Sequence, residues 1–321
     1  MMPSMPDDGS QTMDTRMNAL FRYRRLGYLV MNVTDIERAT RFAVDIFGLD
    51  MECERADGSR CFRAGSHHHD VILVQAEKAA LARAAWELEN DRELKLAFRH
   101  FSEQGLKPAW VGGAECDDLR IERAFRIVDP AIGMTWEFYA DMNFMPAIRK
   151  NPLARFQGGK HFGLLVPDSH ASSAYLMKEM GFACSDYFAG HNGVFMRAWP
   201  NPNHHSLAMF SDGSDVTRLH HVAFMVEEID DIGRLFNRIR RHQVDIHFGI
   251  GRHPTSYSIH LYIYGPDNFV WEYTLGMEQF AETGAREARR MSDNPGDFDL
   301  WGAVPDGSRL DVLPEVLLSR G

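Results

Sequence analysis

The chain has 321 residues, of which 45% are hydrophobic and 25% are charged, as is typical of a globular protein of about two domains. Its 45 acidic and 35 basic residues give a net charge of −10, which argues against a nucleic-acid partner because binding phosphates requires a basic surface. No apolar run approaches the roughly 18 residues of a membrane span, and the polar, acidic N-terminus lacks the features of a signal peptide. We therefore expect a cytoplasmic protein that binds neither nucleic acid nor a membrane.

The first half of the chain predicts two βαβββ modules. A strand over 25–33 leads into a helix that starts at Thr34, where Glu37 completes a capping-box spacing, and that ends at Gly48. The remaining strands of this module are expected around 51–55, 60–63 and 70–75. The second module is expected to contain a strand at 85–89, a helix at 92–104 and strands near 109, 123–128 and 135–139.

Four short motifs return after a nearly constant interval, which indicates a duplicated domain. Two of them recur at a displacement of 133 positions: Val33-Thr-Asp35 as Val166-Pro-Asp168, and Phe47-Gly48-Leu49 as Met180-Gly181-Phe182. The others recur at displacements of 136 and 135: His68-His69 as His204-His205, and Trp136-Glu137-Phe138 as Trp271-Glu272-Tyr273. The predicted divisions are a disordered lead-in over 1–22, an N-terminal non-catalytic domain over 23–143, a linker over 144–157, a C-terminal metal-binding domain over 158–280 and a tail over 281–321.

The two copies differ at positions that could bind a metal. His161 of the second copy corresponds to Tyr28 of the first, and the first copy has no histidine in the stretch 79–90 that corresponds to His221. Glu137 and His69 persist in the first copy, where we expect them to be packed or hydrogen-bonded remnants. Only the second copy keeps a complete set of possible ligands.

Glu272 lies in an apolar hairpin. Residues 261–264 and 269–273 read as strands on either side of a Gly-Pro-Asp-Asn turn. A carboxylate among such neighbours must be compensated by a metal, a cation or hydrogen bonds. From this stretch alone, a solvent-exposed position at a sheet edge stays an equal alternative to a metal ligand.

His161 and His221 open two further strands of the second copy. If the modules form curved sheets that face each other, His161, His221 and Glu272 meet in one cavity. Two imidazoles and one carboxylate on one face suit non-heme Fe(II), with open positions for a substrate and O₂. Mn(II) fits the same ligands, whereas zinc prefers a closed tetrahedron.

Three further side chains, His205, His253 and Tyr262, are predicted to lie on strands near the same mouth. Such proton-active groups beside an open metal site indicate acid-base work on an oxygenated substrate, although each alone also fits a structural role. His204 and His220 precede His205 and His221 by one residue, so we expect them to face away from the metal site.

At these residues the second copy resembles the extradiol ring-cleaving dioxygenases of the vicinal oxygen chelate superfamily, the catechol 2,3-dioxygenase and dihydroxybiphenyl dioxygenase type. The motif of this family is met by Gly251-Arg252-His253, Leu261-Tyr262, Pro266 and Glu272, while Gly265 and Asn268 depart from the usual residues beside the proline. The resemblance covers about residues 22–305. It implies an α+β fold of two tandem vicinal-oxygen-chelate domains, each of two βαβββ modules that form a curved, partly closed sheet.

The resemblance also implies a function in aromatic hydrocarbon catabolism. The three metal ligands would be His161, His221 and Glu272, and Fe(II) or Mn(II) would be chelated by both hydroxyls of a catechol before O₂ opens the ring. His205 would be the acid-base group, and His253 and Tyr262 would hydrogen-bond substrate oxygens. A homo-oligomer is implied as well.

The substrate pocket is predicted from three small residues. Gly163 lies two positions after His161 and would leave space beside the bound ring, or else would only relieve strand packing. Thr255 and Ser256 would line another wall, and the tail after Ala281 could close over the mouth as a lid. We therefore expect a substituted catechol whose substituent is carboxylated or otherwise polar.

Two other functions remain as alternatives. A glyoxalase-like isomerase of the same superfamily would need a second Glu or Gln in place of one histidine, which the pair His161 and His221 disfavours. A non-catalytic small-molecule-binding protein of this fold would need no ligand triad. A metal assay followed by addition of a catechol in air would separate these functions from a dioxygenase.

Overall fold

The computed structural model describes residues 19–145, 150–190, 192–294 and 297–318. The first half contains, in chain order, β1 (Tyr23–Val33), α1 (Ile36–Arg41), a π-helical segment (Phe42–Phe47), β2 (Asp50–Glu54), β3 (Arg60–Arg63), β4 (Val71–Gln75), β5 (Ala80–Leu88), α2 (Asp91–Glu103), β6 (Ala109–Trp110), α3 (Gly113–Leu119), β7 (Ile121–Val128) and β8 (Thr135–Met142).

The second half contains β9 (Phe156–Leu165), α4 (Ser169–Met180), β10 (Phe182–Phe188), β11 (Gly193–Ala198), β12 (Leu207–Phe210), β13 (Arg218–Val226), α5 (Ile229–His242), β14 (Ile246–Arg252), β15 (Ile259–Tyr264), a 3₁₀ turn (Pro266–Asn268) and β16 (Val270–Leu275). The C-terminal segment adds β17 (Arg289–Met291), a 3₁₀ helix (Gly307–Val312) and β18 (Glu315–Val316).

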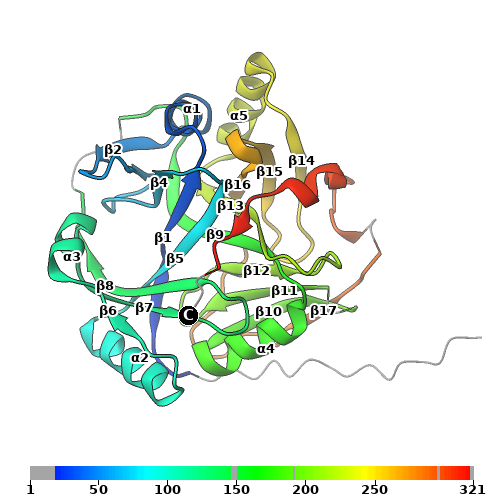
Figure 1. Ribbon diagram of the computed structural model, residues 1–321. Helices are drawn as coiled ribbons and strands as arrows, with labels where there is room; N and C mark the ends of the chain where they lie inside the picture. The colour runs from blue at the N-terminus through cyan, green and yellow to red at the C-terminus, as the bar shows by residue number, and fades with distance from the viewer. Residues whose placement is uncertain (1–18, 146–149, 191, 295–296, 319–321) are drawn as a thin grey trace, which may run out of the picture.

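Both halves have the same order of paired strands, and Figure 1 labels most of these strands. Pairing in the first half runs β2-β3-β4-β1-β5-β8-β7-β6, with β1 parallel to β4 and antiparallel to β5. Pairing in the second half runs β10-β11-β12-β9-β13-β16-β15-β14, with β9 parallel to β12 and antiparallel to β13. The repeated βαβββ modules inferred from the recurring motifs are therefore present in the strand pairing, while the predicted domain boundaries stay a prediction.

Side chains alternate along the central strands, so one face of the sheet packs into the hydrophobic core and the other face points away from it. On β9, Phe162 and Leu164 join the main hydrophobic core, so His161 and Gly163 point to the other side. The core also joins the two halves, because the rings of Trp86 and Phe182 lie 5.0 Å apart. The opposite face of the sheet can therefore carry polar side chains such as His161.

The helix of the first module begins one residue later than its capping-box spacing predicts. Asp35 is the N-cap and accepts a hydrogen bond from Arg38 N, whereas Thr34 hydrogen-bonds to Asp267 from the distant turn. The end at Gly48 is confirmed, with φ of 92°, where glycine avoids the strain of a left-handed backbone. Helix α3 was not predicted, because its 7 residues are too few to show a clear apolar period.

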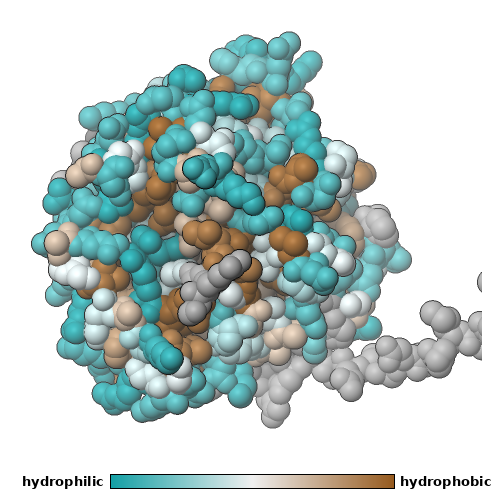
Figure 2. Space-filling model, in the orientation of Figure 1, coloured by the Kyte–Doolittle hydropathy of each residue, from teal (hydrophilic) through white to brown (hydrophobic). Residues whose placement is uncertain are grey.

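The described residues nearest both ends of the chain pack onto the sheets. Most of the predicted disordered lead-in, residues 1–18, lies outside the described residues, but Phe21 is 2% exposed and contacts Phe101. In the tail, β17 pairs with β10, and β18 bridges β13 of the second half to β5 of the first. The face shown in Figure 2 is mostly hydrophilic, with hydrophobic residues gathered near its centre. No described helix is long and apolar enough to cross a lipid bilayer.

Candidate metal centre and substrate cavity

Three neighbouring strands bring His161, His221 and Glu272 together. On β9, His161 pairs with Ala223 of β13, and Ala223 in turn pairs with Glu272 of β16. His221 lies two residues before Ala223 and therefore shares its face of the sheet. The convergence predicted from the sequence is present.

The donor atoms of these three side chains lie within 4.8 Å of one another. The Nε2 atoms of His161 and His221 lie 3.0 and 3.6 Å from Oε2 of Glu272. His221 Nε2 and Glu272 Oε1 are buried and have no hydrogen-bond partner, and each such atom costs about 1–3 kcal/mol. A divalent cation among the three would satisfy both atoms, so the residues fit a metal.

The protonation state of His221 also suits a metal ligand. Burial, together with the neighbouring His220 and His161, holds the pKa of His221 well below its usual value. The imidazole is therefore neutral at pH 7 and can offer a lone pair.

Gly163 makes room for this imidazole. A Cβ at position 163 would lie 2.4 Å from Cε1 of His221, which is far inside van der Waals contact. The prediction that Gly163 leaves space for a substrate is therefore wrong, because the ring of His221 fills that space. Its position two residues after His161 correctly predicted the face of the strand, but it did not show that the ring of His221 lies beside it.

His205 lies next to this cluster but not on a strand. Its ring centroid is 4.3 Å from that of His161, and its side chain precedes β12 in a loop. Nδ1 of His205 lies 3.0 Å from Nδ1 of His204, whose Nε2 is 2.8 Å from Oδ2 of Asp186. His204 does not line the substrate cavity and contacts Asp186 instead, in agreement with the structural role expected for it.

Tyr262 and His253 form a second polar pair beside the cluster. Tyr262 on β15 is paired with Glu272 on β16, and its hydroxyl lies 2.9 Å from Nε2 of His253. Burial, with Glu272 nearby, raises the pKa of Tyr262 well above its usual value, so the phenol keeps its proton. His253 lies in the turn after β14, stacked on His260 at 4.0 Å, so only Tyr262 of the three predicted catalytic residues lies on a strand.

A cavity of about 370 Å³ opens beside these groups. Its polar lining includes His205, His221, His253 and Tyr262 together with His220, which was expected to face away. The rest of the wall is largely aromatic, formed by Phe188, Phe195, Phe210, Phe248 and Phe298. Its described lining contains Asp212 but no lysine or arginine.

The other two predicted pocket residues lie elsewhere. Thr255 and Ser256 are 2% and 0% exposed and do not line this cavity. The hydroxyl of Ser256 is instead hydrogen-bonded to that of Ser258 at 2.8 Å. Their position just after His253 suggested a wall of the pocket, but the turn carries both side chains into the protein.

The corresponding position of the first half is filled by protein side chains. Glu137 is fully buried, hydrogen-bonded to the hydroxyl of Tyr28, and paired with Arg126 at 2.6 Å and with Arg83 at 3.2 Å. Two arginines and a phenol therefore compensate the carboxylate there. The expectation that Glu137 is a hydrogen-bonded remnant is confirmed.

Two other groups of potential ligands gather among the described residues. One consists of Cys61, His68 and His69, where burial raises the pKa of the Cys61 thiol and keeps it protonated. The other consists of Asp186, His204 and Glu278, whose carboxylates are already paired with Arg286 and Arg289. Neither group matches a metal centre as well as the triad does.

Comparison with known proteins gives similar dioxygenases. Residues 159–273 match the family model described as Glyoxalase/Bleomycin resistance protein/Dioxygenase superfamily. A 1,2-dihydroxynaphthalene dioxygenase of Sphingobium xenophagum is 26% identical over 265 residues, covering 78% of this chain and 88% of that protein. An iron-dependent extradiol dioxygenase of Rhodococcus jostii (strain RHA1) is 24% identical over 298 residues, covering 87% and 96% of the two chains.

The fold agrees as well. The crystal structure of BphC, a halotolerant catechol dioxygenase, superposes with a TM-score of 0.82 at 23% identity, covering 92% of this chain and 98% of that one. The α+β fold of two tandem vicinal-oxygen-chelate domains, expected from the sequence motifs, is thereby confirmed. Taken with the superfamily match over residues 159–273, the fold and the His-His-Glu cluster, the chain is similar to the type I extradiol dioxygenases of the vicinal oxygen chelate superfamily.

Proposed function

We propose that this protein is an Fe(II)-dependent dioxygenase that opens the ring of a substituted catechol beside its two hydroxyl-bearing carbons and incorporates both atoms of O₂. The observation that carries the proposal is a buried set of two imidazoles and a carboxylate that adjoins an aromatic-lined cavity. The iron-dependent relative in Rhodococcus jostii supports the choice of metal.

The metal would be held by His161, His221 and Glu272. When bound, Fe(II) would supply a Lewis-acid template with open positions for the two catechol oxygens and O₂. Mn(II) accepts the same donor set, so it is the alternative metal.

The proton-active residues would position the substrate and move its protons. The hydroxyl of Tyr262, joined to His253, would hydrogen-bond a catechol oxygen at the cavity wall. His205 is held neutral by burial and would accept and return a proton as the catechol hydroxyl ionises and the ring opens. His204 and Asp186 would act through His205 by fixing the direction of its ring.

The substituent on the catechol is inferred to be an uncharged aromatic ring. A carboxylated catechol would lose its hydration in this cavity without gaining a lysine or arginine partner, which is unfavourable. The phenylalanine walls favour a flat apolar group instead. This inference replaces the polar substituent that Thr255 and Ser256 had suggested, and the dihydroxynaphthalene dioxygenase of Sphingobium xenophagum supports it.

The test starts with protein loaded anaerobically with Fe(II). The metal content should be about one ion per chain, and both His161→Ala and Glu272→Gln should lose it while keeping the far-ultraviolet circular dichroism of the wild type. Addition of 2,3-dihydroxybiphenyl in air should consume one O₂ per yellow product formed, with a higher kcat/KM than catechol or 3,4-dihydroxyphenylacetate.

Three outcomes would count against the proposal. Stoichiometric iron in the His161→Ala protein would contradict the ligand assignment. Conversion of a substrate without uptake of O₂ would favour the isomerase alternative, and tight binding of catechols without conversion would favour a binding protein. A cytoplasmic location, a homo-oligomeric state and the lack of a nucleic-acid or membrane partner stay predictions from the sequence.

A further inference from the structure

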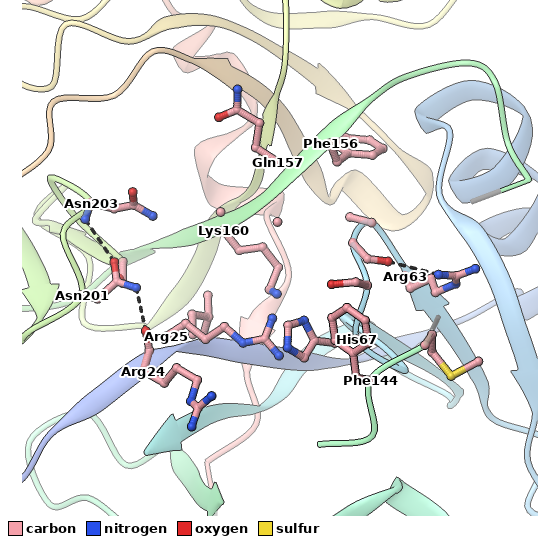
Figure 3. A pocket seen from close by; sticks show the side chains of 18 residues that line it. Arg24, Arg25, Arg63, His67, Phe144, Phe156, Gln157, Lys160, Asn201 and Asn203 are labelled. Atoms are coloured by element: carbon pink, nitrogen blue, oxygen red, sulfur yellow. Dashed lines mark hydrogen bonds between the residues drawn. The ribbon is translucent and has the colours of Figure 1, made fainter. Parts of the chain in front are cut away.

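A second cavity, of about 600 Å³, adjoins strand β9 (Figure 3). It lies between the two halves of the chain, because residues of β1 and of the loop after β3 form one side and residues of β9 form the other. Lys160 lines this cavity, whereas the next residue, His161, points to the opposite face of the strand. The cavity is therefore separate from the metal-ligand cluster.

Three glycines leave this cavity open. Gly65, Gly158 and Gly159 all line the cavity and place no side chain in it. A Cβ added at Gly65 would meet only the Cα of Gly158, at the ordinary contact distance of 3.6 Å. A larger side chain at position 65 would thus be tolerated by the backbone and would occupy the cavity.

The charged side chains that line the cavity are all basic: Arg24, Arg25, Arg63 and Lys160. No aspartate or glutamate is among its described lining residues. Figure 3 shows the amine of Lys160 and the guanidinium of Arg25 pointing toward the same space beside His67. Nη2 of Arg25 is buried without a hydrogen-bond partner, so a donor remains available there.

Each of these cations has a carboxylate partner outside the cavity lining, and Arg24 and Arg63 pair with Asp141 and Glu52. Asp70 pairs with Lys160, and Glu87 pairs with Arg25 at 2.6 Å, but neither carboxylate lines the cavity. Burial, and then the charges of Arg25 and Lys160, lower the pKa of His67 to about 3. The cavity wall therefore offers N–H donors of basic side chains and a neutral imidazole but no carboxylate, which favours an anionic ligand.

The remaining wall suits an organic molecule. Leu26, Phe144 and Phe156 provide apolar surface, and the amides of Asn201 and Asn203 provide further polar groups. A volume of about 600 Å³ exceeds what a bare inorganic anion needs and lies in the usual range of small-molecule sites. We propose that this cavity binds a small organic anion, namely a carboxylate attached to an apolar, ring-sized body.

The proposal does not depend on the dioxygenase activity, so its test uses the metal-free full-length chain. Benzoate carries the required carboxylate and ring, benzamide is a neutral molecule of similar shape, and inorganic phosphate is an anion without an apolar body. Calorimetry should detect binding of benzoate, and the Tm should rise with benzoate concentration because the ligand binds only the folded chain. Benzamide should give no rise, and phosphate should give a smaller one.

Two variants locate the binding. Lys160→Gln removes a charge but keeps a donor for Asp70, and it should weaken benzoate binding about tenfold or more, as expected for a hydrogen bond to a charged group. Gly65→Leu fills the cavity without changing any charge, and it should abolish binding. Their controls are Arg155→Gln, at an ion-paired arginine outside the cavity, and Gly249→Leu, at a glycine with nothing within 4 Å of an added Cβ.

Each outcome decides the proposal. Loss of benzoate binding in both cavity variants, with wild-type binding in both controls, supports it. Equal binding of benzamide would show that no anion is recognised, and binding of phosphate alone would overturn the organic ligand. Wild-type affinity for benzoate in Gly65→Leu would place the ligand elsewhere, including the aromatic cavity beside His221.

Discussion

At the scale of single residues, Gly163 has the most specific consequence for the metal centre. A Cβ there would lie 2.4 Å from Cε1 and 2.6 Å from Nδ1 of His221, so even Gly163→Ala must displace the imidazole. We expect Gly163→Ala to reduce iron affinity at least about tenfold, the loss that disturbed support of a metal ligand typically causes. Metal titration followed by mass spectrometry of the bound iron measures this.

The matched control for that prediction is Gly249→Ala, since nothing lies within 4 Å of a Cβ at that position. It should bind iron like the wild type. If Gly163→Ala retained full iron affinity and only changed the ranking of catechols, the substrate-pocket role predicted for Gly163 would be restored.

His205 and His204 should differ in how they affect turnover. His205→Phe removes the acid-base group and should reduce kcat by about 10² or more while iron still binds. His204→Phe keeps the His205 imidazole but removes the contacts that connect it through His204 to Asp186. The kcat should therefore fall less than in His205→Phe, and the pH profile of kcat should change. Steady-state kinetics from pH 5 to 9, with iron content determined in parallel, compares them.

A wild-type kcat for His205→Phe would reduce that residue to a structural role. A His204→Phe protein whose kcat and pH profile both match the wild type would show that the contact with His205 has no positioning effect.

Most of the metal centre could be predicted from the sequence, because its ligands lie on regular strands. Alternation correctly placed His161, His221 and Glu272 on one face, and comparison of the two repeats showed that the first copy lacks both histidines. It failed for His220, which lines the cavity beside a register shift of β13, and it gave no indication of Asp186, which contacts His204 from β10. Contacts between distant segments of the chain depend on tertiary packing that no local pattern encodes.

At the scale of elements, strand pairing was predictable and the path of the tail was only partly so. The hairpin of β15 and β16 around the Pro266–Asn268 turn follows from its composition, and the register confirms it. The tail was expected to cover the mouth as a lid, and it does supply Phe298, Pro305 and Leu310 to the cavity wall. Its pairing of β17 with β10 has no local signal, since Arg289–Met291 is only three residues long.

The tail contact can be tested through Phe298. This ring lines the substrate cavity and lies 5.0 Å from the ring of Phe188. Phe298→Ala should lower kcat/KM for 2,3-dihydroxybiphenyl about tenfold, which corresponds to roughly 1.4 kcal/mol of lost apolar contact. The value for unsubstituted catechol should change much less, because a small substrate does not reach that wall.

The comparison is made within one protein preparation by measuring both substrates. An equal fall for both would mean that Phe298 supports the fold or the metal centre and does not contact the substituent. Val304→Ala, at a tail side chain that is 81% exposed, is the matched control and should behave like the wild type with both substrates.

At the scale of the whole molecule, the two halves are joined by a buried ion pair. Lys160 of β9 contacts Asp70, which follows β3 in the first half, and the two side chains are 3% and 1% exposed. Burial lowers the pKa of Lys160, so keeping its amine charged in the folded protein costs free energy. The Asp70 carboxylate offsets this cost, because it also accepts hydrogen bonds from Ala64 N and Gly65 N and is stabilised as the ion.

This pair makes the stability depend on pH in the acid range. Burial alone would raise the pKa of Asp70, but Lys160 and Arg25 overcome that effect and lower it to about 2. An unfolded aspartate has a pKa of about 3.9, so the stabilisation is complete above that pH and is lost as pH falls from about 4 to about 2. Asp70→Asn should therefore cost about 3 kcal/mol of unfolding free energy at pH 7 and much less at pH 2.5.

Urea unfolding of both proteins between pH 2.5 and 7 measures this difference. The control is Asp245→Asn, where the carboxylate pairs with Arg309 at 2.6 Å but is 61% exposed, and its effect should stay within about 0.5 kcal/mol at every pH. A gap between wild type and Asp70→Asn that stayed constant down to pH 2.5 would mean that Asp70 acts through packing and not through its charge. If the gap closes as expected, the pair joins the two halves electrostatically, one residue away from the metal ligand His161.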